Sequence, residues 1–513
     1  MKIMFRVDAY RKMGIGHLMR CLTLANELRK NDSDITFVIS YSNEYLISLI
    51  QSYGFQIESF ELSNAEATIS NSLEIDYDFW NKILWKEDSE KTLKIARKIK
   101  PKLIVVDHYG LDAKWHHELR SATKKIMVID DLANRNLDCD LMLNQTFGIS
   151  NLAYKDLVSA ECKLLVGAKY ALIRRDFAQL RHAATIKRQK KSEVSRILIS
   201  LGGSSHIDLI CQILKNLADI KWPFKPIVDI VLTNNEQNID SLREGIKKTD
   251  LKINLMNDVD NMAKLMLEAD FAIGASGSTT WERCCLGLPS VVFGLAENQM
   301  DILKNLDSFG AIISMGKDTE FDNSFFCKKV MKIISRSSYS ESLISKSFSI
   351  CDGLGARRVY LALNPFKAKD GNHIHLREAL LDDSEMLLKW QHIKEVRQYA
   401  RNPSTPSLNE HESWMHKKIK ESTSYFWIIM HNDEPSGVIR LDNIEGFQYE
   451  VSIFVIPQKF GLGIAKSSIY SIQYLFEGVA NFSATILPEN KASIKLFMST
   501  GFIFDNERQL YIW

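Results

Sequence analysis

Features that would point to a membrane, a secretory compartment or nucleic acid are missing from this sequence of 513 residues. No apolar run approaches the roughly 18–20 residues needed to cross a bilayer. Residues 1–8 meet a charge too early for the core of a signal peptide. The formal net charge is only +2, from 65 basic and 63 acidic residues. We therefore expect a cytoplasmic protein whose partners include neither nucleic acid nor a membrane.

Cysteine is sparse and follows no binding pattern. The 8 cysteines are scattered, none forms a Cys-x-x-Cys pair, and Cys284 and Cys285 are adjacent. This arrangement suits neither a zinc knuckle nor a disulfide scaffold, so we interpret them as buried thiols. We also find no metal-ligand cluster suited to neutralising a diphosphate. Asp130 and Asp131 are better explained as an acidic pair in a loop or at a helix start, and we expect no required metal.

The composition, with 45% hydrophobic and 25% charged residues, is that of a globular protein with an ample core. At roughly 100–200 residues per domain the length predicts about three domains, and we place them at 1–185, 190–362 and 371–513. The basic stretch 181–191 reads as a connector between the first two. A nucleic-acid patch is the weaker alternative, because no aromatic residues interleave it. A second break, at 364–372, combines turn formers and charge.

Short apolar runs rich in β-branched residues alternate with amphipathic helical patterns over the first two domains. This alternation is typical of doubly wound α/β domains with a parallel sheet buried on both faces. In the third domain, consecutive strands follow one another, which indicates an α+β domain. The expected strands are 3–7, 34–39, 103–107, 126–129 and 164–166, then 196–201, 227–232, 252–255, 271–273 and 290–293, and finally 373–377, 426–431, 437–441 and 449–455.

The first strand leads into a loop with Gly14 and Gly16, and His17 stands where the next helix begins. Glycines let the backbone approach a ligand closely, and free amides at a helix start favour anions. His17 would lie at the carboxyl edge of the sheet, where open α/β sheets bind ligands, and an imidazole there could act as a general base near neutral pH. The alternative is a helix-capping or merely positioned histidine.

Two similar strand-to-helix turns follow in the second domain. Gly203 and Ser204 lie in the first, and the second, 274–282, carries small and hydroxyl residues. Amides and hydroxyls at such a helix start could hold a diphosphate. Glu282, about one turn into the helix, could accept both ribose hydroxyls. The alternative is an ordinary N-cap, Ser278 or Thr279, with a glutamate placed as in a capping box.

A series of short motifs follows in a fixed order over residues 1 to about 360. They lie at 6–8, 14–25, 106–110, 129–133, 200–204, 277–283, 287–289, 297–299 and 352–356. Together they resemble the GT-B glycosyltransferase fold. Their residues are most similar to the motifs of the family of UDP-2,4-diacetamido-2,4,6-trideoxy-β-L-altropyranose hydrolases of pseudaminic acid synthesis. The resemblance implies hydrolysis at the anomeric carbon, with His17 as the base that activates water and Tyr109 and Asn298 near the sugar. The substrate-binding residues that we expect are Gly14, Gly16, Arg20, Gly203, Ser204, Gly277, Ser278, Thr279, Glu282 and Gln299.

In the third domain the strand 449–455 leads into Gln458-Lys-Phe-Gly461-Leu-Gly463 and an amphipathic helix. Such a turn offers successive amides to a pyrophosphate. Together with Asn490-Lys-Ala-Ser493-Ile-Lys-Leu-Phe497 it resembles the GNAT acetyltransferases over about 371–513, which implies acetyl-CoA as co-substrate. The cofactor-binding residues implied by the resemblance are Val455, Gln458, Phe460, Gly461, Gly463, Ile464, Ala465, Asn490, Ser493 and Phe497.

Phe497 stands where this family often has a tyrosine that protonates the leaving thiolate. Tyr511 on the last strand is a possible substitute, although a structural role is the simpler reading. Glu450 could take a proton from the amine through water, and a surface salt bridge is the equal alternative. Two segments, 382–390 and 411–414, resemble GNAT enzymes that act on the 4-amino group of UDP-sugars.

The sequence therefore predicts a GT-B-like pair of doubly wound Rossmann-type domains followed by an α+β GNAT domain. The GNAT domain would acetylate UDP-4-amino-4,6-dideoxy-N-acetyl-β-L-altrosamine, and the first two domains would hydrolyse the product to free sugar and UDP. Two alternatives remain open. One is a GT-B glycosyltransferase with a fused acetyltransferase, and the other is a non-catalytic nucleotide-sugar-binding protein.

Overall fold

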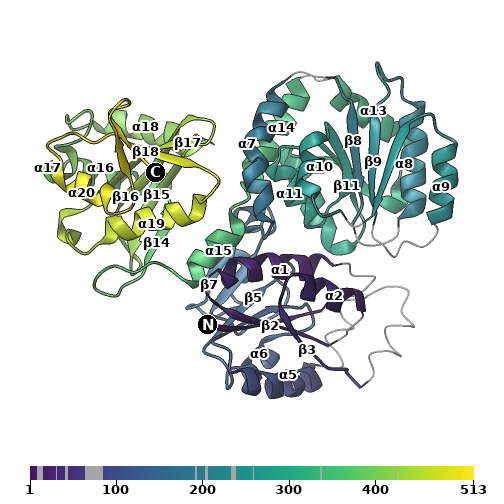
Figure 1. The fold of residues 1–513 in the computed structure, drawn as a ribbon, viewed down its shortest axis with the longest axis horizontal. Coiled ribbons are helices and arrows are strands. Elements are labelled where there is room, and N and C mark those ends of the chain that lie inside the picture. The colour runs from purple at the N-terminus through teal and green to yellow at the C-terminus, as the bar shows by residue number, and fades with distance from the viewer. Residues whose placement is uncertain are drawn as a thin grey trace. The chain divides into compact units, whose positions relative to one another are not determined.

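The computed structural model describes the chain except residues 9–14, 31, 41–43, 64–84, 191–192, 203–205, 233–238, 258, 336–337 and 422. Contacts divide the chain into two compact units, unit 1 (Met1–Ala356) and unit 2 (Arg357–Trp513) (Figure 1). Each unit has buried hydrophobic clusters of its own. None of the described helices combines the length and the apolar composition needed to cross a bilayer.

The first half of unit 1 is a parallel sheet of seven strands in the order β3-β2-β1-β4-β5-β6-β7. Its central strands are buried on both faces, as their continuous apolar runs predict. The strands are β1 (Lys2–Val7), β2 (Asp34–Ile39), β3 (Gln56–Ser59), β4 (Leu103–Asp107), β5 (Lys125–Ile129), β6 (Leu141–Asn144) and β7 (Lys163–Val166). The helices are α1 (Gly16–Arg29), α2 (Glu44–Ser52), α5 (Trp85–Ile99), α6 (Ala113–Leu119) and α7 (Arg175–Gln189).

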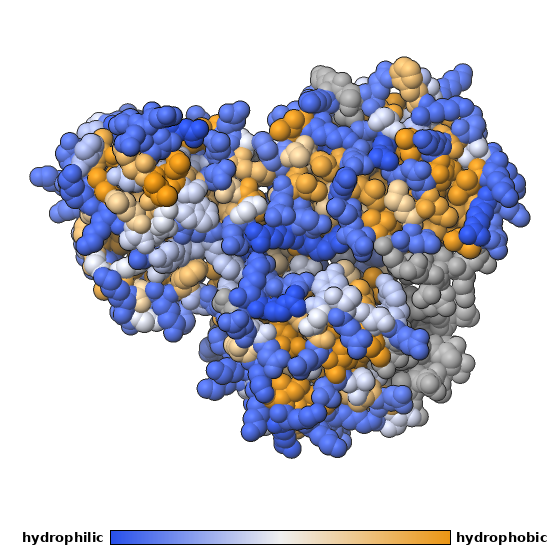
Figure 2. Space-filling view, viewed as in Figure 1, coloured by the Kyte–Doolittle hydropathy of each residue, from blue (hydrophilic) through white to orange (hydrophobic). Residues whose placement is uncertain are grey.

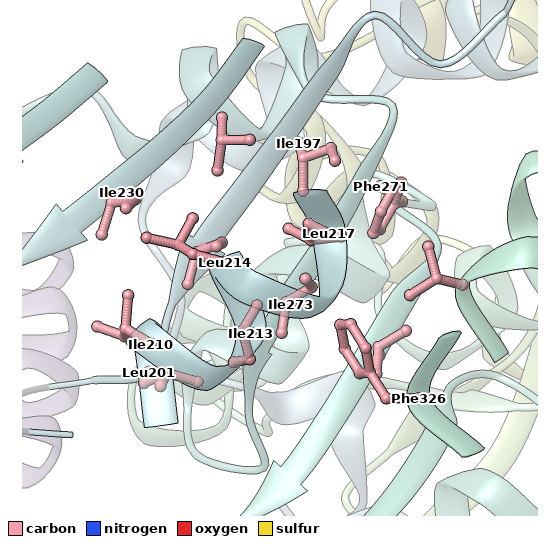
Figure 3. Packing of buried hydrophobic residues seen from close by; sticks show 14 of the residues in the cluster. Ile197, Leu201, Ile210, Ile213, Leu214, Leu217, Ile230, Phe271, Ile273 and Phe326 are labelled. Atoms are coloured by element: carbon pink, nitrogen blue, oxygen red, sulfur yellow. The ribbon is translucent and has the colours of Figure 1, made fainter. Parts of the chain in front are cut away.

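The second half of unit 1 is a parallel sheet of six strands in the order β10-β9-β8-β11-β12-β13. Apolar residues spaced three and four apart on α8 pack against the strands beneath, for example Leu214 and Leu217 near Ile197 (Figure 3). The strands are β8 (Arg196–Ser200), β9 (Ile227–Leu232), β10 (Lys252–Asn257), β11 (Phe271–Ala275), β12 (Ser290–Gly294) and β13 (Ile313–Lys317). The helices are α8 (Ile207–Asp219), α9 (Ile239–Lys247), α10 (Met262–Glu268), α11 (Thr279–Cys285), α12 (Met300–Phe309), α13 (Asn323–Ile334) and α14 (Ser338–Ile350). The next helix, α15 (Gly355–Leu363), lies mostly in unit 2.

The basic stretch read as a connector is largely helical and belongs to α7. Arg188 donates to the carbonyls of Met266 and Ala269 at the end of α10, and Arg181 donates to the carbonyl of Cys285 at the end of α11. The last carbonyls of a helix lack partners within it and carry partial negative charge, so cations stabilise them. The arginines of this stretch therefore stabilise helix ends within unit 1.

Unit 2 is built on a mixed sheet in the order β14-β15-β16-β17-β18-β20-β19. β17 and β18 run parallel and pair only over residues 448–450 and 481–483, so the rest of β17 extends beyond the pairing. The strands are β14 (Ile374–Glu378), β15 (Tyr425–His431), β16 (Glu434–Glu445), β17 (Gln448–Val455), β18 (Asn481–Ala484), β19 (Ile503–Asp505) and β20 (Leu510–Ile512). The helices are α16 (Ser384–Gln391), α17 (Lys394–Arg397), α18 (Leu408–Lys420), α19 (Ile464–Phe476) and α20 (Lys491–Met498).

The break expected at 364–372 is part of unit 2. Before it, Tyr360 of α15 stacks on Tyr474 of α19 with ring centroids 4.4 Å apart, and Arg357 donates to the carbonyl of Leu475 at 2.8 Å. Within it, the amide of Lys369 donates to the carbonyl of Leu462 at 2.8 Å. Unit 2 thus begins before the predicted domain start at 371, because α15 and the following turn pack on α19.

The face of the molecule seen in Figure 2 carries mainly hydrophilic residues, with hydrophobic ones in smaller groups among them. Within the described part of the chain, large apolar side chains that stay exposed include Phe460, Ile503 and Trp513 of unit 2. Scattered exposure of this kind is common on globular proteins and carries no argument by itself.

We predict that a chain of residues 355–513 is more stable than one of residues 372–513. The shorter chain loses the buried side chains of Val359 and Tyr360 and the bonds of Arg357. Losing about 2 kcal/mol or more of apolar burial should lower its melting temperature by at least about 5 °C. Circular dichroism on heating measures this, and coincident melting curves would show that α15 adds nothing to unit 2.

Candidate active sites

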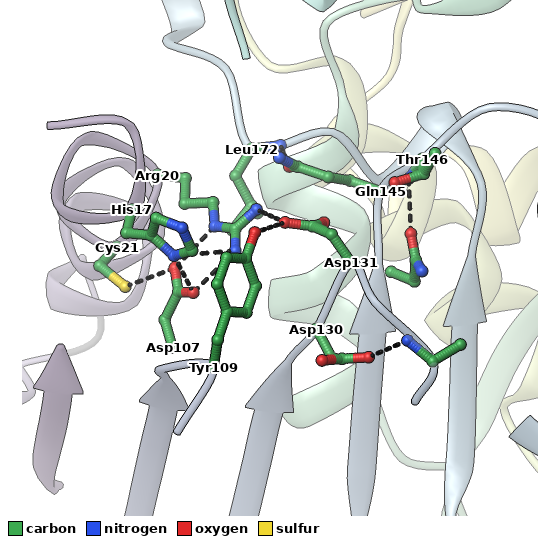
Figure 4. Close-up of polar contacts among 12 residues, drawn as sticks. His17, Arg20, Cys21, Asp107, Tyr109, Asp130, Asp131, Gln145, Thr146 and Leu172 are labelled. Carbon is green, nitrogen blue, oxygen red and sulfur yellow. Dashed lines mark hydrogen bonds and ion pairs between the residues drawn. The ribbon is translucent and has the colours of Figure 1, made fainter. Parts of the chain in front are cut away.

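His17 lies where three elements of the first sheet meet. β4 ends at Asp107, α1 begins at Gly16, and Asp131 lies in the loop after β5 (Figure 4). Because carboxyl ends of parallel strands share one edge of a sheet, the fold brings these side chains together. Only 8% of His17 is exposed. The sequence predicted His17 at this edge, and the structure places it there.

Asp107 fixes the tautomer of His17. The Nδ1 atom of His17 lies 2.6 Å from Oδ1 of Asp107. Burial alone would raise the pKa of Asp107, yet the charge of Arg20, together with His17, holds that pKa well below its usual value. A carboxylate can only accept, so Nδ1 carries the proton and Nε2 is left with its lone pair. Nε2 has no hydrogen-bond partner among the described residues, so the ring presents a basic nitrogen.

Arg20 is engaged by two carboxylates. Its Nε and Nη2 atoms donate to the two oxygens of Asp107 at 2.6 and 2.7 Å, and Nη1 donates to Asp131 at 2.5 Å. Nη2 also lies 3.2 Å from Nδ1 of His17, but both atoms carry hydrogens, so this contact is no hydrogen bond. Arg20 is 5% exposed. Its position favours holding the acidic groups over the direct substrate contact implied by the resemblance.

Tyr109 lies against the imidazole edge-on. The two ring centroids are 4.6 Å apart at 84°, and the Tyr109 hydroxyl donates to Asp131 at 2.9 Å. This places Tyr109 beside His17, and its expected position near the sugar stays a prediction. Asp107 and Asp131 were not among the predicted site residues. The signal was present, because Asp107 ends one predicted strand and Asp131 comes two residues after another.

The second half of unit 1 contributes the start of α11. A Cβ atom placed on Gly16 would lie 3.6 Å from the Ser278 Oγ, so the starts of α1 and α11 are adjacent. Sequence spacing could not reveal this approach between residues 262 positions apart. Gly14, Gly203 and Ser204 lie outside the described residues.

Ser278 does not cap α11. It has helical dihedral angles and makes no side-chain bond to the amides of the first turn. The capping alternative for Ser278 is therefore not what the fold uses. Its hydroxyl and the amide of Thr279 remain available to an anion, whereas the amides of Thr280 and Trp281 donate to the carbonyls of Gly277 and Ser278 at 3.0 and 3.1 Å. Thr279 is turned toward Arg283, whose Nη1 donates to the Thr279 hydroxyl at 3.1 Å.

Arg283 is a buried cation beneath this turn. Its Nη2 donates to the carbonyl of Ala275 at 2.7 Å and to the hydroxyl of Thr280 at 3.0 Å. Burial lowers its pKa to about 10, so it stays charged at neutral pH. No carboxylate among the described residues pairs with it. Gly274 is required here, because a Cβ would lie 2.5 Å from Nη1. A positive charge under α11 favours a negatively charged ligand above it.

Glu282 is a half-buried carboxyl on α11. Burial raises its pKa to about 7, because the opposing effect of the positive charge of Arg174 is smaller. Within the described part of the chain it makes no hydrogen bond of its own. Such a group gains from donors that a ligand brings, such as a pair of hydroxyls.

Asn298 and Gln299 lie in the turn before α12. The Oδ1 atom of Asn298 is buried and has no partner in the described residues. Gln299 accepts from the amide of Leu295 at 3.1 Å, and its Nε2 lies 3.9 Å from where a Cβ on Gly277 would stand. This turn therefore borders the α11 turn, and Asn298 holds an unused acceptor.

In unit 2, the Gly-x-Gly turn has the geometry that its sequence predicts. Gly461 and Gly463 have φ angles of +78° and +77°, which L residues rarely adopt. α19 starts at Ile464 with no side-chain cap, and Ile464 and Ala465 supply first-turn amides. Around Gly461 the space is open, because nothing lies within 4 Å of its Cβ position.

The residues around this turn differ in exposure. Gln458 and Phe460 are exposed, whereas Val455, the last residue of β17, is buried. Asn490 caps α20 by accepting from the amide of Ser493 at 3.1 Å, which occupies the Ser493 amide and leaves the Asn490 Nδ2 free to donate elsewhere.

Phe497 is a core residue. It is 3% exposed and meets Phe502 edge-on at 4.9 Å. As a hydrocarbon it offers no proton, so the fold gives this position a packing role. The acid for a leaving thiolate must come from elsewhere.

Glu450 and Tyr511 face opposite sides of the sheet of unit 2. Tyr449 packs on Phe476 of α19, so its neighbour Glu450 faces away from that helix. Tyr511 shares the face of Trp513, two residues on, which stacks on Phe482. Both lie at the point where β17 and β18 part, because Glu450 pairs with Ser483 and Tyr511 pairs with the next residue.

Glu450 is held by two groups. Its Oε1 accepts from the Thr485 hydroxyl at 2.7 Å and from Arg401, whose side chain is 74% exposed. Tyr511 is 8% exposed, and its ring centroid lies 5.0 Å from that of Phe504. The salt-bridge alternative for Glu450 is thus present in the fold.

The acidic pair considered as metal ligands is taken up by other groups. Asp130 accepts from Arg135 at 2.6 Å and from Tyr154 at 2.7 Å, while Asp131 binds Arg20 and Tyr109. Among the described residues, no group of three His, Cys, Asp or Glu side chains is arranged to hold a metal. That no metal is required stays a prediction.

Comparison with known proteins agrees with the two-part organisation. A family model described as acetyltransferase (GNAT) domain matches residues 373–503. Acetyltransferase PseH of Campylobacter jejuni is 24% identical over 131 residues, covering 25% of this chain and 82% of that protein. The predicted GNAT domain is confirmed.

The chain is also similar to the UDP-2,4-diacetamido-2,4,6-trideoxy-beta-L-altropyranose hydrolase of Campylobacter jejuni, 28% identical over 287 residues, covering 56% of this chain and 89% of that protein. Uncharacterized protein MJ1062 of Methanocaldococcus jannaschii is 26% identical over 519 residues, covering 98% and 96%. The crystal structure of Acinetobacter baumannii MurG aligns with a TM-score of 0.50 at 12% identity, covering 71% of this chain and 99% of that one. The resemblance read from the motifs and the GT-B-like fold are confirmed.

We predict that Glu282 makes the protein less stable as the pH rises from about 4.5 to 7. The folded carboxyl, with its pKa near 7, still binds a proton that the unfolded chain, near 4.5, has released. Glu282→Gln mimics the protonated form, so the variant should match the wild type near pH 4.5 and melt higher at pH 8. The exposed Glu244 gives the control Glu244→Gln. Parallel melting-temperature profiles for Glu282→Gln and wild type over this range would contradict the assignment.

Proposed function

We propose that this chain is a bifunctional enzyme that acts twice on one UDP-linked sugar. Unit 2 transfers an acetyl group from acetyl-CoA to the 4-amino group of UDP-4-amino-4,6-dideoxy-N-acetyl-β-L-altrosamine. Unit 1 hydrolyses the product, UDP-2,4-diacetamido-2,4,6-trideoxy-β-L-altropyranose, to UDP and free sugar. The similarities to the hydrolase and to PseH support both steps. The observation that carries the hydrolysis is a basic nitrogen of His17, set by Asp107, beside the start of α11.

In unit 1, His17 is the general base. Its Nε2 takes a proton from water as the water oxygen bonds to the anomeric carbon and the bond from that carbon to the UDP oxygen breaks. The electron pair of the broken bond leaves with UDP. Asp107 stabilises the imidazolium that forms, because its carboxylate lies against the protonated Nδ1.

The start of α11 holds the leaving group. The Ser278 hydroxyl and the amide of Thr279 bind the diphosphate, and the buried charge of Arg283 stabilises the negative charge that grows on it. Glu282 accepts the ribose hydroxyls. Asn298, whose Oδ1 lacks a partner in the described chain, accepts from a sugar hydroxyl or amide.

In unit 2, the amine attacks the thioester carbonyl from the face of Glu450, and acetyl-CoA lies on the face of α19. Glu450 accepts the amine proton through water, and Tyr511 donates a proton to the departing thiolate. The two residues face opposite sides of the sheet where β17 and β18 part. That arrangement separates the base from the acid, as transfer between two substrates requires.

We predict that His17→Ala lowers hydrolysis by about 10²–10⁴-fold while UDP still binds, because the variant loses only proton transfer. Asp107→Asn should lower turnover at least about tenfold, since an amide can present its NH₂ group to Nδ1 and favour the wrong tautomer. The exposed His117 provides a control, His117→Ala. UDP release from the acetylated UDP-sugar, with no acceptor present, measures all three.

Near-normal release of UDP by His17→Ala would refute the role of His17. Release that depends on an added acceptor would favour a glycosyltransferase instead of a hydrolase. UDP binding with no release by the wild-type protein would favour a non-catalytic binding protein.

We predict that Gly461→Glu abolishes acetylation and leaves hydrolysis unchanged. The side chain enters the open space above the turn, where its charge repels the diphosphate of acetyl-CoA. Gly461→Ala is the matched control, because it adds only the strain of a side chain at positive φ. Thiol release from acetyl-CoA with the amino sugar reports the effect. Equal activity of the Glu and Ala variants would show that the turn does not seat the diphosphate.

A further inference from the structure

The segment before β14 lies directly on the Gly-x-Gly turn of unit 2. The amide of Lys369 donates to the carbonyl of Leu462 at 2.8 Å, and the Ser467 hydroxyl of α19 donates to the carbonyl of Lys367 at 2.7 Å. Asp370 accepts from His431 at the end of β15, with the atoms 2.9 Å apart. Two attachments therefore fix this short segment against the start of α19, and a third joins it to β15.

The side chain of Lys369 runs over Gly463. Its Cγ lies 3.2 Å and its Cε 3.7 Å from the position that a Cβ of Gly463 would take. The whole aliphatic stem thus follows the residue that caps α19, and the ammonium group lies beside the helix start. Glycine at position 463 leaves room for this stem and readily adopts the positive φ of this position.

The ammonium group of Lys369 has no ion-pair partner in the described part of the chain. Two carboxylates of unit 2 are paired with other groups: Asp370 binds His431, and Glu434 binds Lys459 at 2.8 Å. Lys369 is exposed, but its stem packs along Gly463 and its ammonium group, without an ion pair in the described chain, lies at a helix start that no side chain caps. It provides a point charge where free amides already favour an anion.

We infer that Lys369 binds the diphosphate of acetyl-CoA, so that the acetyl-CoA site of unit 2 includes a residue from outside the part that matches the GNAT family model, which starts at residue 373. The inference rests on the proposed use of acetyl-CoA. The segment that joins the end of α15 to β14 is then a component of the cofactor site as well as a covalent connection.

Isothermal titration of the full-length protein with CoA tests this inference. Lys369→Met keeps the aliphatic stem and removes the charge, so it should weaken CoA binding about three- to tenfold at low salt. Lys369→Arg should bind like the wild type. Lys367→Met removes a neighbouring exposed charge and should leave binding unchanged. The loss in Lys369→Met should shrink as salt is raised, because screening weakens the contact in the wild type.

Titration with 3′-dephospho-CoA identifies the phosphate. The penalty of Lys369→Met should persist with this ligand, since the diphosphate is intact. Wild-type affinity of Lys369→Met for CoA, or an equal loss in Lys367→Met, would overturn the inference while leaving acetyl-CoA use standing. A penalty that disappears with 3′-dephospho-CoA would overturn the assignment to the diphosphate. If the wild-type protein bound no CoA, the proposed acetyl transfer would itself be wrong, and the inference with it.

Discussion

The buried carboxylate of Asp107 is the group on which the proposed hydrolytic site depends. Burial alone would favour its protonated form, but Arg20 donates to both of its oxygens and keeps it charged. A charged Asp107 requires the proton of His17 to sit on Nδ1, which leaves Nε2 as the base. Arg20 is in turn anchored by Asp131, which also receives the Tyr109 hydroxyl. One buried carboxylate thus sets both the tautomer and the orientation of His17, the proposed base.

In the other half of unit 1 there is also a buried charge that an opposite charge would stabilise. Arg283 is buried under the start of α11 without a carboxylate partner in the described chain, and the adjacent Gly16 brings the start of α1 within reach of Ser278. A diphosphate over α11 would supply the missing negative charge and would lie next to His17. Substrate binding and the position of the base are therefore linked by the packing of the two halves.

Most strands, the Gly-x-Gly turn of unit 2 and the place of His17 could be predicted from the sequence, because apolar runs and glycine spacing report local conformation. The tertiary contacts of the site residues could not be predicted from it. The bonds that join Asp107 to Arg20 and the approach of Gly16 to Ser278 depend on tertiary packing, which no local pattern encodes. The stretches at 181–191 and 364–372 were interpreted as linkers for a related reason, because charged residues and turn formers are typical of linkers. In the fold, the arginines of α7 bind the carbonyls at helix ends, and Lys369 is fixed to the turn before α19.

The central claim is that one chain performs two consecutive steps on one sugar. Time-resolved NMR of the full-length protein with the 4-amino UDP-sugar and acetyl-CoA tests it most directly, because N-acetylation and anomeric cleavage give separate signals. The account predicts that the acetamido signal of the UDP-linked sugar appears first and that free reducing sugar and UDP follow, with neither product formed when acetyl-CoA is omitted. Cleavage of the unacetylated sugar at the same rate, or acetylation that is never followed by cleavage, would contradict it.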